Sequence, residues 1–446
     1  MSHALTGLVT AAALAGAGVA AVRFWRLSAL AAAYKAKVLC TAVFGSGLTL
    51  EPNRAPEVSD EAYRPMRLFR ARVDRQGRRV SVSAPGRGTR VAVHRPGLGA
   101  TLALGPLVDL PVPPPGPAAA PWPDAPESTA LERVVEGSFA EPDRRHLRRT
   151  RAVLIARHGR ILAERYADGI GPDTPLPGWS MTKAVMGTLI GVLVGEGKLS
   201  VSSKKLLPEW SAPGDPRAGI ALEDLLRMRS GLRFREVYSD PASDVSKMLF
   251  MTPDAGGYAA SLPLERRPGE LWKYSSGTSN ILSLIARRAL GDAAYAALPR
   301  RALFDPLGMA SAVIEPDASG TFVASSYMLA TARDWARFGR LCLEDGVHEG
   351  RRLLPEGWMR FSTTVTPQSG GRYGAQWWLK LNPELGGGTP AEARLPDDAF
   401  HALGHEGQCL TMIPSLGLIV VRLGLSIRID AWDHAAFLAA VLDTLR

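Results

Sequence analysis

A proline-rich stretch, PVPPPGPAAAPWPDAP at residues 111–126, constrains the fold of this chain more than any other feature. Proline fixes its own φ angle and lacks an amide hydrogen, so such a run cannot form a helix or a central strand. We therefore treat residues 111–129 as a linker between an N-terminal part and a larger C-terminal part, residues 130–446. With 446 residues, the chain has room for one large catalytic domain and its extensions.

The C-terminal part begins and ends with strand patterns and is helical between them. Residues 152–169 predict a two-stranded hairpin around His158 and Gly159. Near the other end, strands are expected at residues 373–381, 401–413 and 417–424, and helices at 180–194, 222–231, 278–290, 330–346 and 433–445. This order predicts an α+β fold, in which an antiparallel sheet built from both ends of the segment is flanked by helices and carries a helical insertion.

The first 22 residues contain an uncharged apolar run, LTGLVTAAALAGAGVAAV, at residues 5–22. Eighteen such residues are just enough to span a bilayer, and Arg23 and Arg26 follow with two aromatic residues between them. We expect membrane association through this segment, and a membrane-anchored or cell-envelope location of undetermined orientation. A cleaved signal peptide and a buried Ala/Gly-rich helix are the alternatives.

Residues 23–110 predict an N-terminal extension that is first helical and then β, because RRVSVSA and TRVAVHR alternate apolar and polar residues. Residues 1–150 carry 20 Lys and Arg against 12 Asp and Glu, which is most of the net charge of +10. Beside an apolar segment, this excess favours an anionic membrane surface. No nucleic-acid-binding motif accompanies the charge, so we expect no nucleic-acid partner. The oligomeric state is not indicated.

The stretch GWSMTKAVMG places Ser180 three residues before Lys183, at the start of an apolar helix. Residues i and i+3 share a helix face, and the first turn of a helix offers free N–H groups that stabilise a developing oxyanion. A buried lysine with a lowered pKa can take the serine proton. The alternative is that Ser180 is simply the helix N-cap. Ser202 and Lys205 repeat the spacing in a polar break.

Two later stretches offer the other groups that acyl transfer needs. Tyr274 and Ser276 lie in PGELWKYSSGTSN, where a tyrosine favoured as phenolate by nearby cations would relay the serine proton. His405 and Gly407 lie in ALGHEGQCL, where a strand glycine indicates close approach by a ligand. The N–H of Gln408 would then complete an oxyanion hole with that of Ser180.

Together these motifs resemble the serine hydrolases of the penicillin-recognising superfamily, which includes class C β-lactamases, D-alanyl-D-alanine carboxypeptidases and related esterases and amidases. SMTK is similar to their Ser-x-x-Lys box, YSS to their Tyr-x-Asn or Tyr-x-Ser box, and HEG to their Lys-Thr-Gly or His-x-Gly box. PGELWKYSSGTSNIL, YGAQWWL and HRPGLGATL look most like the 6-aminohexanoate-dimer hydrolase branch. The resemblance implies a β-lactamase-like fold over residues 130–446.

The resemblance also implies roles for individual residues. Ser180 would be the acylated nucleophile, with Lys183 and Tyr274 as its general acid and base. Ser276 would replace the asparagine that binds substrate amides, His405 would line the pocket, and the Gln408 N–H would bind the oxyanion. A histidine at the third box is not a permanent cation, so the chain fits the esterase and amidase branches better than the lactamases.

The sequence therefore predicts a serine hydrolase that cleaves a small ester or linear amide through an acyl-enzyme. No metal or organic cofactor is expected, because acyl transfer needs only the protein's own groups and neither C-x-x-C nor H-E-x-x-H occurs. One alternative is a cell-wall D,D-peptidase or a class C-type β-lactamase. Another is a non-catalytic module that binds peptidoglycan or lipid.

Overall fold

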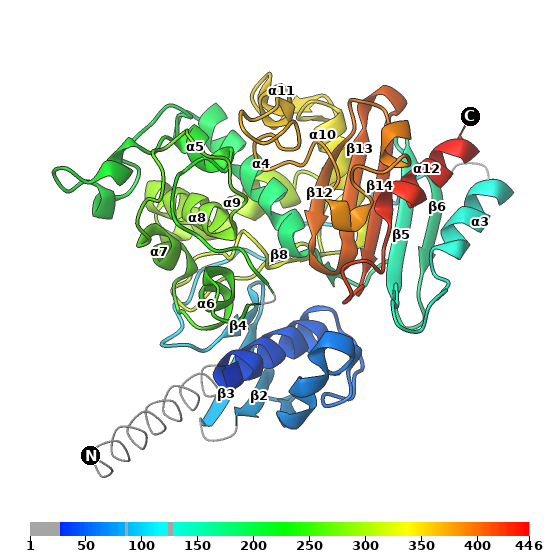
Figure 1. Ribbon diagram of the computed structural model, residues 1–446, viewed down its shortest axis with the longest axis horizontal. Coiled ribbons are helices and arrows are strands. Elements are labelled where there is room, and N and C mark those ends of the chain that lie inside the picture. The colour runs from blue at the N-terminus through cyan, green and yellow to red at the C-terminus, as the bar shows by residue number, and fades with distance from the viewer. Residues whose placement is uncertain (1–26, 85–87, 124–127, 239, 446) are drawn as a thin grey trace, which may run out of the picture.

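The computed structural model describes residues 27–84, 88–123, 128–238 and 240–445. Its larger part is built on a five-stranded antiparallel sheet (Figure 1). In sheet order the strands are β12 (Phe400–Gly404), β13 (Gln408–Ile413), β14 (Leu418–Gly424), β5 (Thr150–Arg157) and β6 (Arg160–Tyr166). Because β14 pairs with β5, the two ends of the segment meet inside one sheet, as the strand patterns predicted.

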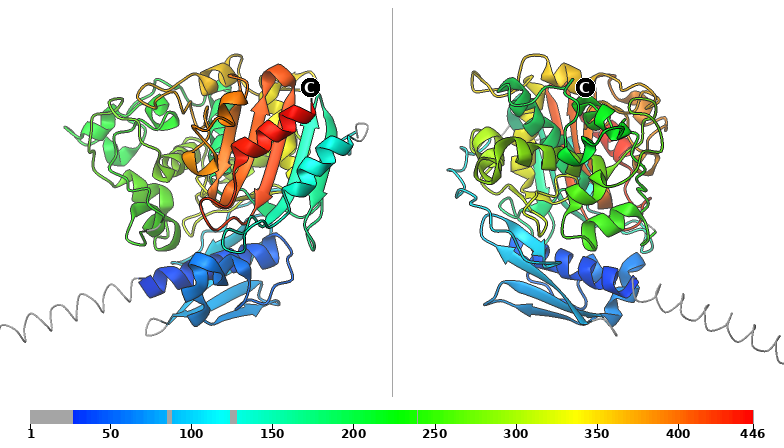
Figure 2. Two further views of the ribbon diagram at one scale, coloured as in Figure 1. Left: turned by 45° about the vertical axis from the view of Figure 1, so that its right-hand side comes forward. Right: turned by 90° about the vertical axis from the view of Figure 1, so that its left-hand side faces the viewer.

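Helices cover both faces of this sheet (Figure 2). Val153 of β5 lies in one apolar core with residues of α3 (Thr129–Gly137) and α12 (His434–Thr444). The next residue, Leu154, lies in the other core, on the side of α10 (Ala332–Leu343). Successive strand side chains point to opposite faces, so the unbroken apolar run of β5 supplies both cores.

A helical region lies between β6 and β12 along the chain. Its helices are α4 (Thr182–Gly195), α5 (Leu222–Leu226), α6 (Asp244–Phe250), α7 (Ala255–Ala260), α8 (Ser276–Leu290), α9 (Asp292–Pro299) and α11 (Trp358–Thr363), besides α10. Short strands here are β7 (Leu176–Pro177), β8 (Val313–Ile314), β9 (Met328–Ala330), β10 (Val347–His348) and β11 (Arg351–Arg352). Every residue of α4 from 182 to 193 is buried, and apart from Thr182, Lys183 and Thr188 these residues are apolar or glycine.

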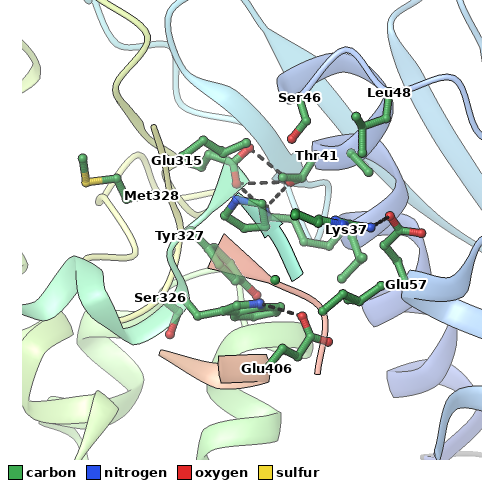
Figure 3. Close-up of a pocket in the computed structure, with 18 residues that line it drawn as sticks. Lys37, Thr41, Ser46, Leu48, Glu57, Glu315, Ser326, Tyr327, Met328 and Glu406 are labelled. Atoms are coloured by element: carbon green, nitrogen blue, oxygen red, sulfur yellow. Dashed lines mark hydrogen bonds and ion pairs between the residues drawn. The ribbon is translucent and has the colours of Figure 1, made fainter. Parts of the chain in front are cut away.

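The N-terminal extension is a helix followed by a four-stranded sheet, in the order that the sequence predicted (Figure 1). It consists of the helix Leu27–Gly45, α2 (Pro56–Ser59), the 3₁₀ helix η2 (Glu61–Leu68), β1 (Ala71–Asp74), β2 (Arg79–Ala84), β3 (Gly88–Arg95) and β4 (Gly99–Leu102). Lys37 of the first helix pairs with buried Glu315 of the larger part (Figure 3). Glu315 also accepts the Ala100 N–H of β4 at 2.6 Å. One carboxylate therefore links both the helix and the sheet of the extension to the larger part.

Among the described residues, Leu27–Gly45 is the helix long and apolar enough to cross a membrane, but 72% of its most apolar window is buried in the protein. Its Lys35 ammonium donates to the Phe69 carbonyl at 2.8 Å, and Lys37 is equally enclosed. These contacts are those of a core helix. The predicted membrane segment, residues 5–22, lies outside the described residues.

Three predicted elements are wrong in detail. Residues 373–381 make only isolated bridges, because Gln376 adopts a left-handed φ of 65° that turns the chain. The helix predicted over 222–231 ends at Leu226, since Met228 has a φ of 58°. Residues 401–413 form two strands instead of one, because positive φ values at Glu406 (62°) and Gly407 (78°) close a hairpin.

Candidate active site

Ser180 lies in a strained turn at the entrance to α4. The turn is a 3₁₀ helix, η3 (Trp179–Met181), in which Trp179 has a φ of 47°. A Cβ on Gly178 would approach the Trp335 ring to 2.4 Å, so only glycine fits before the turn. A non-glycine residue in the left-handed region stores strain and is typical of functional sites. The N-cap of α4 is Met181, with no side-chain cap, so Ser180 is not the cap.

The Lys183 ammonium group is the centre of the arrangement. Its Nζ lies 2.9 Å from Ser180 Oγ, 3.0 Å from Ser276 Oγ and 2.8 Å from the Ser325 carbonyl oxygen. The side chain is 1% exposed. Burial lowers the pKa of Lys183 from 10.5 to about 8, although the nearby carboxylate of Glu236 opposes that change. Near neutral pH a minority of Lys183 is therefore neutral, and only that form accepts a proton.

Tyr274 lies beside both residues. Its ring centroid is 4.9 Å from Lys183 Nζ, and its hydroxyl is hydrogen-bonded to Ser180. Burial, reinforced by Glu236, raises the pKa of Tyr274 above its usual value of 10, and the bond to Ser180 offsets only part of this. The condition for a phenolate, favourable nearby cations, is outweighed by burial, which disfavours the charged form. Tyr274 is a neutral hydroxyl that both donates and accepts.

Ser276 is the first residue of α8, and its hydroxyl contacts Lys183. It is fully buried. Its hydroxyl donates to Glu236 Oε1 at 2.5 Å, and its backbone N–H donates to Glu236 Oε2 at 2.9 Å. The N–H and the hydroxyl proton of Ser276 are therefore committed to Glu236, and binding of a substrate amide by Ser276 stays a prediction. Glu236 itself comes from the irregular segment before α6, where no sequence motif marked it.

His405 borders the nucleophile turn, and its role in lining a substrate pocket stays a prediction. Its ring stacks on Tyr238 at 5.5 Å and meets Trp179 edge-on at 5.5 Å. Its Nε2 lies 3.2 Å from the hydroxyl of Tyr63, in the N-terminal extension. The neighbouring Glu406 accepts hydrogen bonds from Tyr63 at 3.1 Å and from Trp179 Nε1 at 3.1 Å. Sequence patterns indicated no contact between the extension and this turn.

Gly407 and Gln408 both contact other parts of the protein, and the oxyanion role of the Gln408 N–H stays a prediction. A Cβ on Gly407 would approach Arg422 Nη1 to 2.5 Å, so this glycine accommodates a buried arginine and not a ligand. The Gln408 side chain is buried and exchanges hydrogen bonds with the backbone of Gly424. Gly404, at the end of β12, is instead the glycine that meets the nucleophile turn, since its Cβ would lie 2.3 Å from the Gly178 carbonyl oxygen.

The second Ser-x-x-Lys pair is unlike the first. Ser202 is hydrogen-bonded to Ser200 in an exposed loop, and Lys205 has a φ of 53° outside any helix. The described residues contain no group of three or more His, Cys, Asp and Glu able to hold a metal ion. The groups that lie around Ser180 and Lys183 are a phenol, a carboxylate and backbone N–H groups.

Comparison with solved structures supports the same fold. A putative 6-aminohexanoate-dimer hydrolase from Bacillus anthracis superposes with a TM-score of 0.58 at 20% identity, over 76% of this chain and 89% of that one. EstCE1, a hydrolase with promiscuous acyltransferase activity, gives a TM-score of 0.55 at 17% identity, over 71% of this chain and 97% of that one. At these identities the likeness concerns the fold.

Sequence comparison identifies the family. The chain is 27% identical over 300 residues to the 6-aminohexanoate-dimer hydrolase of Paenarthrobacter ureafaciens, which covers 61% of this chain and 72% of that protein. The beta-lactamase family model matches residues 135–424, a range that includes Ser180, Lys183 and Tyr274. This chain is a serine hydrolase of the beta-lactamase family.

Proposed function

We propose that the chain hydrolyses a small ester or linear amide through an acyl-enzyme on Ser180. The observation that carries this proposal is the 2.9 Å contact between Ser180 Oγ and the buried Nζ of Lys183. A serine hydroxyl is a weak nucleophile until a nearby base takes its proton. With a pKa of about 8, Lys183 is a base matched to reaction near neutral pH.

The geometry supports a two-stage mechanism. In acylation, neutral Lys183 takes the Ser180 proton while Oγ forms a bond to the substrate carbonyl carbon. Tyr274, hydrogen-bonded to Ser180, donates its proton to the leaving alcohol or amine as the scissile bond breaks and recovers one from Lys183. In deacylation the same groups take a proton from water as it attacks the carbonyl carbon of the acyl-enzyme, and they return that proton to Ser180 Oγ as the ester bond breaks.

The negative oxygen of the tetrahedral intermediates needs N–H donors beside Ser180. We place one at the Ser180 N–H, which lies in the first turn before α4. For the second we favour the N–H of His405, directly after Gly404, over that of Gln408. The support for this choice is that Gly404, the residue before His405, closely approaches the Gly178 carbonyl oxygen in the nucleophile turn. Gln408 lies opposite Gly404 on the next strand, β13.

The charges around Ser180 favour neutral or cationic substrates over penicillins. Glu236 places a carboxylate beside Lys183, and Glu406 places another behind His405. A penicillin brings its own carboxylate, which would meet these negative charges. The Paenarthrobacter relative is named for hydrolysis of an amide dimer, which fits the substrate class proposed for this chain.

Intact mass spectrometry of the full chain tests the proposal. The protein is mixed separately with a p-nitrophenyl ester of a short acid, a linear amide dimer and a penicillin, with Ser180→Ala alongside. We expect a transient acyl adduct and turnover with the ester or amide, both absent in Ser180→Ala. A long-lived penicillin adduct would indicate a cell-wall enzyme instead. No adduct from any substrate with folded protein would favour a binding module.

We also propose that residues 5–22 associate the enzyme with a membrane. The support is the uncharged apolar run followed by Arg23 and Arg26. Leu14→Arg places a charge in the middle of this run, and we expect it to move the protein from the carbonate-resistant membrane fraction to the supernatant. Equal retention of both forms in the membrane fraction would contradict the proposal.

A further inference from the structure

The protonation geometry around Lys183 points to a role for Glu236 that no sequence motif assigns. A neutral lysine amine has two N–H bonds and one lone pair, and it can deprotonate Ser180 only with that lone pair. Three polar atoms surround Nζ: Ser180 Oγ, Ser276 Oγ and the Ser325 carbonyl oxygen. The efficiency of the base thus depends on which of the three neighbours faces the lone pair.

Two of the three neighbours can only accept a hydrogen bond from Lys183. The Ser325 carbonyl oxygen carries no proton. Ser276 has one hydroxyl proton, and it is committed to Glu236 Oε1 at 2.5 Å. An ionised carboxylate only accepts. Tyr238 is also hydrogen-bonded to Ser276, but its own proton goes to Glu236 Oε1, and the 2.5 Å bond to Glu236 is the shortest that Ser276 makes. Ser276 Oγ therefore offers Lys183 a lone pair, and the amine directs one N–H to each of these two neighbours.

The remaining neighbour is Ser180. With both N–H bonds of the neutral amine used, the lone pair of Nζ faces Ser180 Oγ at 2.9 Å. We propose that Glu236 is a positioning residue, which acts through Ser276 to aim the Lys183 lone pair at the nucleophile. The proposal rests on the proposed function, because it concerns the same base and the same nucleophile.

Glu236 is held in the orientation that this role requires. Its two oxygens accept the N–H and the O–H of the same residue, Ser276, which is the first residue of α8. Tyr238 also donates to Oε1, at 2.8 Å. A glutamine cannot reproduce the pair of bonds, because its amide has one acceptor oxygen and its NH₂ group would face a donor. Glu236→Gln therefore removes the constraint without removing volume.

The first test is the pH dependence of kcat/KM for the full chain and Glu236→Gln. The titratable groups that face Lys183 are Glu236 and Tyr274, and Ser325 contributes only its carbonyl. Glu236 favours the protonated amine, so its neutralisation should move the acid limb to lower pH. The plateau should nevertheless fall, about 10-fold to 100-fold, because a misdirected base loses part of its contribution.

A double-mutant cycle asks whether Glu236 acts through Ser276. Ser276→Ala removes the hydroxyl, so adding Glu236→Gln to it should lower the plateau little further. The matched control is Asp240→Asn on the same segment, where the carboxylate bonds to Ala242 and Arg235 and does not contact Ser276. This control should leave both the plateau and the acid limb unchanged.

Three results would overturn the proposal while leaving Ser180 as the nucleophile. These are a Glu236→Gln profile identical to that of the parent, a lowered plateau with an unmoved acid limb, or an undiminished effect of Glu236→Gln in the Ser276→Ala background. If Glu236→Gln does not fold, Glu236→Asp replaces it, because it keeps the charge but shortens the side chain. For this variant we expect a lower plateau of kcat/KM and an acid limb at the same pH as in the parent. An unchanged plateau would refute the proposal. Failure of the proposed function would instead appear as acylation that survives Ser180→Ala.

Discussion

The Tyr63 hydroxyl lies 3.2 Å from Nε2 of His405, so a residue of the N-terminal extension contacts the hairpin turn that borders the nucleophile. The same hydroxyl donates to Glu406, whose other oxygen accepts from Trp179, the residue before Ser180. The extension is therefore continuous with the wall of the candidate active site. The extension thus contacts residues around the nucleophile, although the family match begins only at residue 135.

Tyr63→Phe tests this link. The variant loses its bonds to His405 and to the buried carboxylate of Glu406, so we expect a loss of about 1–3 kcal/mol in the free energy of unfolding and a several-fold lower kcat/KM. Urea unfolding and ester kinetics measure the two effects. Tyr258→Phe is the control, because it removes a comparable bond to Asp244 away from Ser180. Equal kinetics for both variants would show that the extension does not influence the site.

Lys183→Met removes the proposed base while keeping most of the side-chain volume. We expect acylation by an activated ester to slow about 10²-fold to 10⁴-fold. Stability should hold or increase, because an amine that is costly to bury is replaced by an apolar group. Stopped-flow acylation and thermal unfolding check the two parts. Lys205→Met, in the second Ser-x-x-Lys pair, should match the parent protein, and a rate loss there equal to that of Lys183→Met would contradict the assignment.

The pH dependence follows from the lowered pKa of Lys183. Below about pH 8 the amine is protonated and cannot accept the Ser180 proton, and above it the neutral base dominates. The rate should thus rise as pH increases through about 8 and then level off. Initial rates of hydrolysis of an amide, whose spontaneous hydrolysis is slow, measure this between pH 6 and 10. A flat profile over that range would remove Lys183 as the base.

Lys37→Met tests the junction between the extension and the larger part. The change leaves Glu315, 1% exposed, without its cationic partner. Breaking one half of a buried ion pair typically costs about 3–5 kcal/mol, and we expect a loss of that size in chemical unfolding. The control is Arg54→Met, whose pair with Glu51 is exposed and should contribute less than about 1 kcal/mol. Similar losses for both variants would mean that burial of the pair has no consequence.

Local periodicity predicted most of the regular elements. The extension sheet follows from alternating apolar residues, β5 from a short apolar run before the turn at His158 and Gly159, and α4 from the largely apolar run after Lys183. The predictions that failed depend on single residues in left-handed conformations, such as Gln376 and Met228. A residue other than glycine does not indicate such a conformation in the sequence, because tertiary contacts impose it. The domain boundaries at residues 23, 111 and 130 remain predictions.

The sequence by itself determined the Ser180–Lys183 pair, because the i, i+3 spacing on a helix is a local property of the backbone. Only the tertiary structure decided what surrounds the pair. Ser276 reaches Lys183 from 93 residues away, Ser325 from 142, and Glu236 reaches Ser276 from 40. These contacts form when distant segments pack together, and no local pattern encodes them. The nucleophile could therefore be read from a motif, whereas the orientation of its base is a property of the folded core.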